Sequence, residues 1–161
     1  MEHLYAPWRG DYTRNAQCKA DTCPFCPIIQ EASNDDKNFV VQRNEQSIVI
    51  LNLYPYNPGH LLLLPHDHAA KLDDVSITTR QELMETMNNA IEKMTTALGC
   101  QGVNVGINLG QSCAGGSIPE HLHIHLVPRW QGDTNFLPVV AGTKQVSQDL
   151  RVVFEKLKKS F

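Results

Sequence analysis

The sequence predicts an α+β fold: an antiparallel sheet of about five strands with one long helix and a C-terminal helix. Five short runs rich in aliphatic and β-branched residues, typical of strands, are spread over residues 38–127. Several of them follow one another through short turns, which favours antiparallel pairing with segregated helices. One long stretch with a helical period lies between the third and fourth runs.

The strands are expected to alternate with turns that contain proline, glycine or polar residues. The two residues between the first and second runs are consistent with a hairpin. The segment YPYNPGH (54–60) is expected to turn at its two prolines and its glycine. The run HLLLLP that follows is too apolar to lie open to water on both faces. The five expected strands cover residues 38–44, 47–53, 60–65, 103–109 and 121–127.

Two helices are expected. The long one should begin at Thr78 or Thr79, with a Gln or Glu three residues later completing a capping box, and Gly99 should end it. Its core-facing stripe consists of Leu83, Met87, Ala90, Ile91, Met94 and Leu98. The second helix, over residues 147–159, should bury Leu150, Val153, Phe154 and Leu157.

Length and composition indicate one compact domain. The 161 residues, 42% of them hydrophobic, suffice for a single core, so we expect one domain over residues 1–161, with an N-terminal segment (1–37) and a core (38–140). A net charge of -3 gives no basic footprint, so nucleic acid is not expected as a partner. The sequence has no apolar run long enough to span a bilayer and no secretory signal, so we expect a cytoplasmic protein without membrane association.

The five cysteines are odd in number and widely spread, which argues against a disulfide framework. Cys23 and Cys26, in the stretch CPFC, admit two interpretations. One is a redox dithiol, although no strand is predicted before the pair, as such a motif requires. The other is half of a tetrahedral zinc site that needs two more ligands from elsewhere in the chain.

Three of the seven histidines occur in EHLHIHLVPRW (120–130). In a strand, His121, His123 and His125 would share one face, while the apolar residues between them would occupy the other. A single strand histidine is usually structural, but three in register indicate function. They could bind a catalytic metal, or form a catalytic row that receives an anionic substrate.

The loop before the histidines favours the second interpretation. It reads GQSCAGGSIP (110–119) and contains Gly115, Gly116 and Ser117. Such a loop can turn several backbone N–H groups and a hydroxyl toward one anion. Next to three imidazoles, it suggests phosphoryl or nucleotidyl chemistry.

Three stretches together resemble the histidine triad (HIT) superfamily of nucleotide hydrolases and transferases. HLHIHLV is similar to its histidine triad, and LNLYPYNPGHLLLLP (51–65) to its nucleoside-binding strand-turn-strand. VPRWQGDTNF (127–136) and LYAPWRGDY (4–12) resemble one branch, which contains bacterial diadenosine tetraphosphate phosphorylases and hydrolase-like relatives. The similarity covers most of the chain.

The resemblance implies an enzyme that cleaves dinucleoside polyphosphates through a nucleotidyl-histidine. His123 would attack the α-phosphate, and His121 would complete the catalytic row. Asn52 would contact the ribose, with His60 close to the row. The residues implied to bind phosphoryl oxygens are His125, Ser117, Gly115, Gly116 and Asn108.

Ser117 bears on the second half of the reaction. Many relatives have glutamine at this position, four residues before the first triad histidine. The shorter side chain leaves room for inorganic phosphate, so we expect phosphorolysis to ADP, with hydrolysis to AMP as the alternative. Hydrolysis of nucleoside phosphoramidates and a non-catalytic nucleotide sensor also remain open.

The resemblance also bears on the cysteine pair. Carried over by position, His68 and His121 would join Cys23 and Cys26 around a structural zinc ion, with His66 as the rival ligand. No organic cofactor is implied. The family also implies a homodimer or a higher homo-oligomer.

Overall fold

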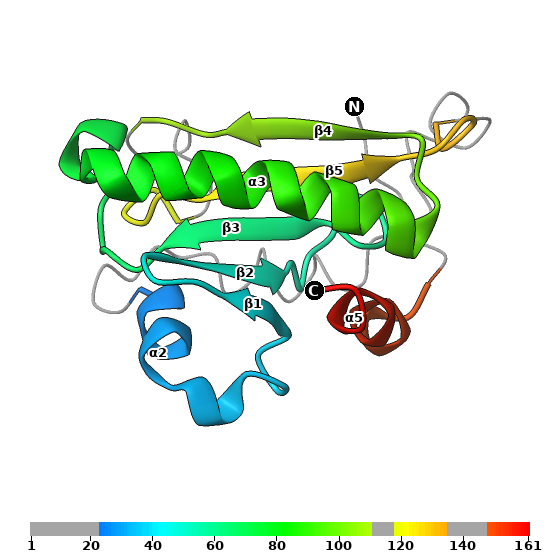
Figure 1. Ribbon diagram of the computed structural model, residues 1–161, viewed down its shortest axis with the longest axis horizontal. Coiled ribbons are helices and arrows are strands. Elements are labelled where there is room, and N and C mark those ends of the chain that lie inside the picture. Colours follow the sequence, from blue (N-terminus) through cyan, green and yellow to red (C-terminus); the bar gives the residue numbers. More distant parts are fainter. Residues whose placement is uncertain (1–22, 111–117, 135–147) are drawn as a thin grey trace.

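The computed structural model describes residues 23–110, 118–134 and 148–161, and its centre is a five-stranded antiparallel sheet. The strand order β1-β2-β3-β5-β4, with helices packed on the sheet, confirms the predicted α+β fold (Figure 1). The strands are β1 (Val40–Arg43), β2 (Ser47–Leu51), β3 (Leu61–Pro65), β4 (Gly102–Ile107) and β5 (Ile124–Arg129). The helices are α2 (Phe25–Gln30), α3 (Ile77–Leu98) and α5 (Leu150–Lys158), with 3-10 turns η1 (Ala32–Asn34) and η2 (Leu72–Asp74).

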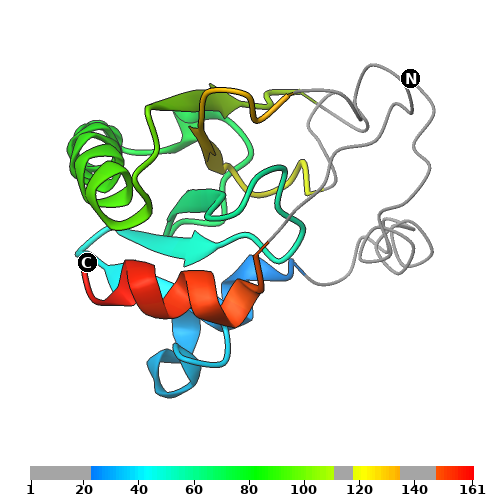
Figure 2. The same ribbon diagram turned by 90° about the vertical axis from the view of Figure 1, so that its right-hand side faces the viewer.

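The central strands are buried on both faces. Along β3, Leu61 and Leu63 belong to the apolar cluster that includes α3 and α5, whereas Leu62 and Leu64 belong to the cluster around Phe25 of α2. α3 therefore covers one face of the sheet (Figure 1), α5 lies beside β1 (Figure 2), and α2 covers the opposite face. This double burial explains why HLLLLP has no polar alternation.

The long helix ends where the sequence predicts, at Gly99, whose φ of 63° suits glycine. Its start differs: the helix begins at Ile77, and the Ser76 hydroxyl caps it by accepting a hydrogen bond from the Thr79 N–H at 3.0 Å. The expected cap at Thr78 or Thr79 was therefore wrong. Glu82 makes no capping box because its carboxylate accepts hydrogen bonds from the β1–β2 turn.

The C-terminal helix is present with the predicted buried face, but it begins at Leu150, three residues later than expected. Asp149 accepts hydrogen bonds from the first N–H groups of α5, and the predicted Val153, Phe154 and Leu157 are buried. Leu150 is partly buried against the same cluster. The hydrophobic spacing therefore identified the buried face of α5.

The strand expected over residues 121–127 is shifted toward the C-terminus, because β5 covers Ile124–Arg129. Of the three triad histidines only His125 lies on it, so the expectation that all three share one face of a strand was wrong. Continuing its register with β3 would place Leu122 opposite Pro65, which has no N–H to donate. Leu122 instead donates its backbone N–H to Ala69 at 2.7 Å. The predicted burial of Leu122, Ile124 and Leu126 is nevertheless confirmed.

The sequence analysis missed α2, a helix of six residues with a proline inside it. The Arg43 guanidinium fastens this helix to the sheet by donating hydrogen bonds to the carbonyls of Ile28 and Ile29 at 2.6 and 2.8 Å. Asp35 pairs with the same guanidinium at 2.6 Å. In the described ranges, no helix combines the length and apolar composition needed to cross a membrane.

Candidate active site and metal-ligand group

The centre of the candidate site is His123, which lies just before β5 and is 6% exposed. Its Nδ1 lies 2.8 Å from the carbonyl oxygen of His121. A carbonyl can only accept, so Nδ1 carries the proton, and in a neutral ring Nε2 keeps its lone pair. The structure thus identifies the backbone acceptor that a nucleophilic histidine requires.

A chain of hydrogen bonds fixes the tautomer of the third triad histidine. The backbone N–H of Tyr56 donates to His60 Nδ1 at 3.2 Å, and the Asn52 amide lies 3.1 Å from the same atom. His60 Nε2 therefore carries a proton and donates to His125 Nδ1 at 2.9 Å. The proton of His125 is consequently on Nε2, which lies 3.3 Å from Asn108 Nδ2. Because both groups then donate, the Asn108 amide must turn its oxygen toward His125 to accept a hydrogen bond from it.

Both rings of this chain are held neutral. Burial, reinforced by the rings of His125 and His123, lowers the pKa of His60 from 6.5 to about 3. Burial and the neighbouring His123 lower the pKa of His125 from 6.5 to about 4. At neutral pH, His125 is therefore a neutral N–H donor rather than a cation.

Two residues of the turn at 54–60 support this pair, and sequence reasoning assigned neither a role. The ring of Tyr56 stacks on His60 with centroids 4.9 Å apart and lies nearly parallel to His125 at 6.0 Å. Asn57 is 2% exposed, and its amide donates to the carbonyl of Pro128 at 2.7 Å. In the sequence, the one indication of such a role was that both residues lie in the motif YPYNPGH and that the partner of Asn57 lies in the motif VPRWQGD.

The first triad histidine faces the cysteine pair. His121 Nε2 lies 3.1 Å from the Pro65 carbonyl and donates to it, so its Nδ1 lone pair points toward Cys23 Sγ, 3.3 Å away. Cys26 Sγ lies 3.2 Å from His68 Nδ1. The four ligand atoms, of Cys23, Cys26, His68 and His121, all lie within 4.8 Å of one another. The structure therefore brings together the four predicted ligands as a possible metal-binding group.

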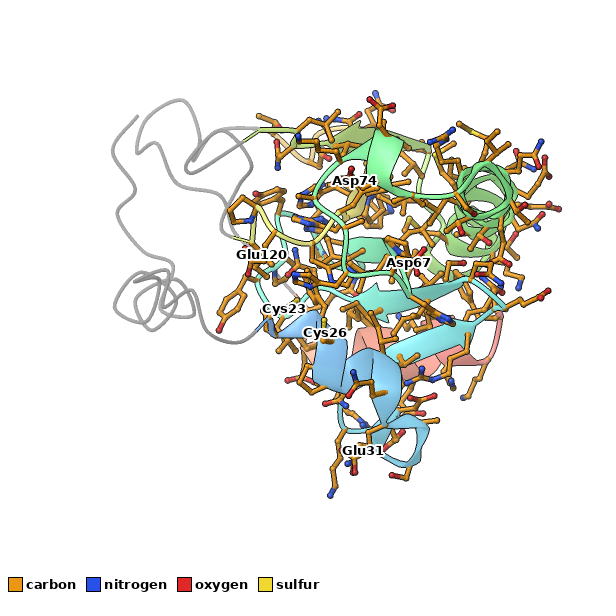
Figure 3. All side chains as sticks on the ribbon, turned by 90° about the vertical axis from the view of Figure 1, so that its left-hand side faces the viewer. Cys23, Cys26, Glu31, Asp67, Asp74 and Glu120 are labelled. Atoms are coloured by element: carbon orange, nitrogen blue, oxygen red, sulfur yellow. The ribbon has the colours of Figure 1, made fainter. Side chains whose placement is uncertain are left out.

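Figure 3 shows both cysteines at the start of α2, near Asp67 and Glu120, the neighbours of the two histidines in the chain. Burial, and then the adjacent Cys23, raise the pKa of the Cys26 thiol. Burial is also the main cause that lowers the pKa of His121. A bound cation would offset the repulsion between two thiolates, which favours the metal interpretation over a redox dithiol.

The rival ligand His66 lies outside this group. Within the described residues its Nε2 is buried without a hydrogen-bond partner. The three triad rings also do not converge on one point, since His121 faces the thiols while His125 bonds to His60. Three predicted site residues, Gly115, Gly116 and Ser117, lie outside the described residues.

Comparison with known proteins identifies the family. Residues 33–132 match the family described as the HIT domain, which is more than half of the chain. The chain belongs to the HIT family. The resemblance of its motifs to this family is therefore confirmed.

Several HIT relatives are informative. The chain is 40% identical to the AP-4-A phosphorylase of Mycobacterium tuberculosis over 94% of its own length and 80% of that protein. It is 27% identical to an adenosine 5'-monophosphoramidase of Schizosaccharomyces pombe, over 67% and 74% of the two chains. Among solved structures, a zinc-bound histidine triad family protein of Mycobacterium smegmatis is 25% identical, with a TM-score of 0.69 over 86% and 92% of the chains.

Proposed function

We propose that this HIT protein is a nucleotidyl transferase that cleaves dinucleoside polyphosphates such as diadenosine tetraphosphate, with His123 as the nucleophile. The carrying observation is the 2.8 Å contact between His123 Nδ1 and the His121 carbonyl, which leaves a lone pair on Nε2. The 40% identity to a protein named AP-4-A phosphorylase supports this substrate class.

In the first step, His123 Nε2 forms a bond to the α-phosphorus, and the bond from phosphorus to the bridging oxygen breaks. The electron pair leaves with the nucleoside polyphosphate, which is already a stable anion. His125 donates its Nε2 proton as a hydrogen bond to an oxygen of the reacting phosphate. The other residues proposed to hold the substrate are Asn108, Gly115, Gly116 and Ser117 for phosphoryl oxygens, Asn52 for the ribose, and His60 behind His125.

In the second step, an acceptor releases the nucleotide from His123. We propose inorganic phosphate, so that diadenosine tetraphosphate yields ATP and ADP. The support is the name of the mycobacterial relative together with the short side chain of Ser117. Water as the acceptor would give ATP and AMP, which makes the protein a hydrolase.

The test uses diadenosine tetraphosphate with and without phosphate, followed by separation of the products. We expect phosphate-dependent ADP and, in rapid quenching, AMP covalently bound to the protein. His123→Ala should lose the adduct and the turnover, while the control His66→Ala should keep both. Turnover to AMP without phosphate would replace phosphorolysis by hydrolysis, and binding without turnover would indicate a sensor.

Phosphoramidate hydrolysis is the second candidate, favoured by the relative named adenosine 5'-monophosphoramidase. It would use the same nucleophile with an amine as the leaving group. The kcat/KM for adenosine 5'-monophosphoramidate, measured beside that for diadenosine tetraphosphate, separates the two. The higher value identifies the better substrate class.

We further propose that Cys23, Cys26, His68 and His121 hold a structural Zn²⁺. Two thiolates and two imidazoles are a typical donor set for a closed tetrahedral zinc site. The zinc-bound HIT structure from Mycobacterium smegmatis supports the identity of the ion. Elemental analysis should find about one zinc per chain, and Cys26→Ser should lower that content.

We also propose a cytoplasmic homodimer. Among the residues that the structure describes, β4 is an edge strand of the sheet, and its Val105 is 44% exposed. The three described cysteines are free thiols, which suits a reducing compartment. Light scattering and cell fractionation test the two statements.

A further inference from the structure

Phe25, the third residue of the CPFC stretch, is buried in α2 with 6% exposure. It packs in the apolar cluster on the face of the sheet opposite α3. Other buried members of this cluster are Val40, Ile48, Ile50, Leu62 and Leu64. A phenylalanine in such a cluster would ordinarily contribute only hydrophobic burial.

The contacts of Phe25 extend beyond the cluster to the histidines. Its ring centroid lies 5.6 Å from that of His123 at an interplanar angle of 59°, and 5.5 Å from that of His121 at 82°. His125 contacts the ring of His123 as well, at 4.9 Å and 67°. Counting the described residues, the ring of His123 thus has two aromatic neighbours in addition to one hydrogen bond.

These neighbours matter because one hydrogen bond does not fix a ring. The hydrogen bond from His123 Nδ1 to the His121 carbonyl fixes the position of one ring atom. The terminal side-chain torsion angle of histidine, χ2, has a broad energy minimum, so the ring can still rotate. A small rotation about that atom would swing Nε2 away from phosphorus. Packing by Phe25 and His125 restricts this rotation.

Phe25 can restrict His123 because α2 is itself anchored. The residues on either side of the Pro-Phe pair, Cys23 and Cys26, contact His121 and His68 through their thiols. At the other end, Arg43 holds two carbonyls of the helix. The aromatic ring therefore sits on an element tied to the sheet at both ends.

We propose that Phe25 is a positioning residue that aims His123 Nε2 at the reacting phosphate. This inference rests on the proposed role of His123 as the nucleophile. Phe25 acts on the rate of bond formation, because it packs against the attacking ring. Removing the aromatic ring slows nucleotidyl transfer and leaves substrate affinity unchanged.

The test compares Phe25→Leu and the milder Phe25→Met with the control Phe154→Leu. Phe154 is fully buried in the other cluster, and within the described part of the chain its ring contacts Phe39 and no histidine, so its variant makes the same change away from the site. All proteins are assayed well below their unfolding temperatures. We expect the Phe25 variants to lose about tenfold or more in kcat and in the single-turnover rate of nucleotidyl-histidine formation, with KM unchanged.

A second measurement does not depend on turnover. Nitrogen-15 NMR of the imidazoles should show one sharp Nδ1-protonated form for His123 in the parent, and a broadened or mixed signal in both Phe25 variants. A kcat equal to that of Phe154→Leu, or a raised KM with unchanged kcat, would overturn the proposal. If the parent forms no nucleotidyl-histidine, the proposed function fails, whereas the NMR comparison still decides the role of Phe25.

Discussion

His60 is a fully buried histidine whose neutrality has a measurable energetic consequence. Its Nδ1 accepts from the Tyr56 backbone, its Nε2 donates to His125, and burial lowers its pKa from 6.5 to about 3. The unfolded chain can bind a proton on this ring below pH 6.5, while the folded protein cannot until about pH 3. The contribution of His60 to stability is therefore complete above pH 6.5 and is lost as the pH falls toward 3.

The size of this loss follows from the two pKa values. At about pH 4.5 the unfolded imidazole is two pH units below its pKa, and the folded one is still neutral. Each unit corresponds to about 1.36 kcal/mol, so His60 should make the protein about 3 kcal/mol less stable at about pH 4.5 than at about pH 7.5. His125, with a folded pKa of about 4, acts in the same direction.

The assay is urea unfolding of the parent and of His60→Asn at both pH values, in the same chelator so that metal loss is common to both. The cavity in the variant lowers stability at both pH values and cancels in the difference between them. We expect the pH-dependent loss to be smaller in His60→Asn by about 3 kcal/mol. Equal losses in the two proteins would refute the argument that burial keeps His60 neutral.

Three further predictions concern stability. Gly59→Ala should lower the free energy of unfolding by more than about 2 kcal/mol, because the φ of Gly59 is 85° and the added Cβ would overlap Leu98. Gly99→Ala should lower it by about 1 kcal/mol, because the φ of Gly99 is 63° but its Cβ would enter open space. Asn57→Ala should cost about 1–3 kcal/mol in urea unfolding by leaving the Pro128 carbonyl without its partner, and a neutral result would contradict this role. A chelator should lower the unfolding temperature of the parent by several degrees and leave that of Cys23→Ala unchanged, as calorimetry can check.

Local patterns were sufficient for most of the fold. Alternation and apolar runs located all five strands, and helical spacing with Gly99 located α3 and its buried face. The prediction was wrong where a residue that a local sequence rule assigned to its own helix or strand interacts with a different segment, or where its partner cannot form the expected bond. Glu82 bonds to the β1–β2 turn instead of capping its own helix, and Pro65 cannot continue the ladder past Ile124.

The residue types of the candidate site could be predicted from the sequence, but the hydrogen bonds and ring contacts between them could not. The patterns His-x-His-x-His and Cys-x-x-Cys indicated the kinds of chemistry, and the resemblance to HIT proteins indicated His68 as a candidate metal ligand. Neither could show that Asn57 and Tyr56 support the site, because their partners are carbonyls and rings elsewhere in the chain. Phe25 was overlooked for the same reason.

The sequence by itself determined which side chains are available, because the identity and spacing of histidines, cysteines and apolar residues are local properties. Only the tertiary structure decided which nitrogen carries the proton in His60, His121, His123 and His125. Two of those assignments depend on partners far apart in the chain, since His125 is set by His60 at a separation of 65 residues and His121 by the Pro65 carbonyl at 56. The proton of His123 is placed by the His121 carbonyl only two residues away, but the ring reaches that carbonyl only in the folded backbone. Hydrogen-bond direction is set by the neighbour in space, and folding alone supplies that neighbour.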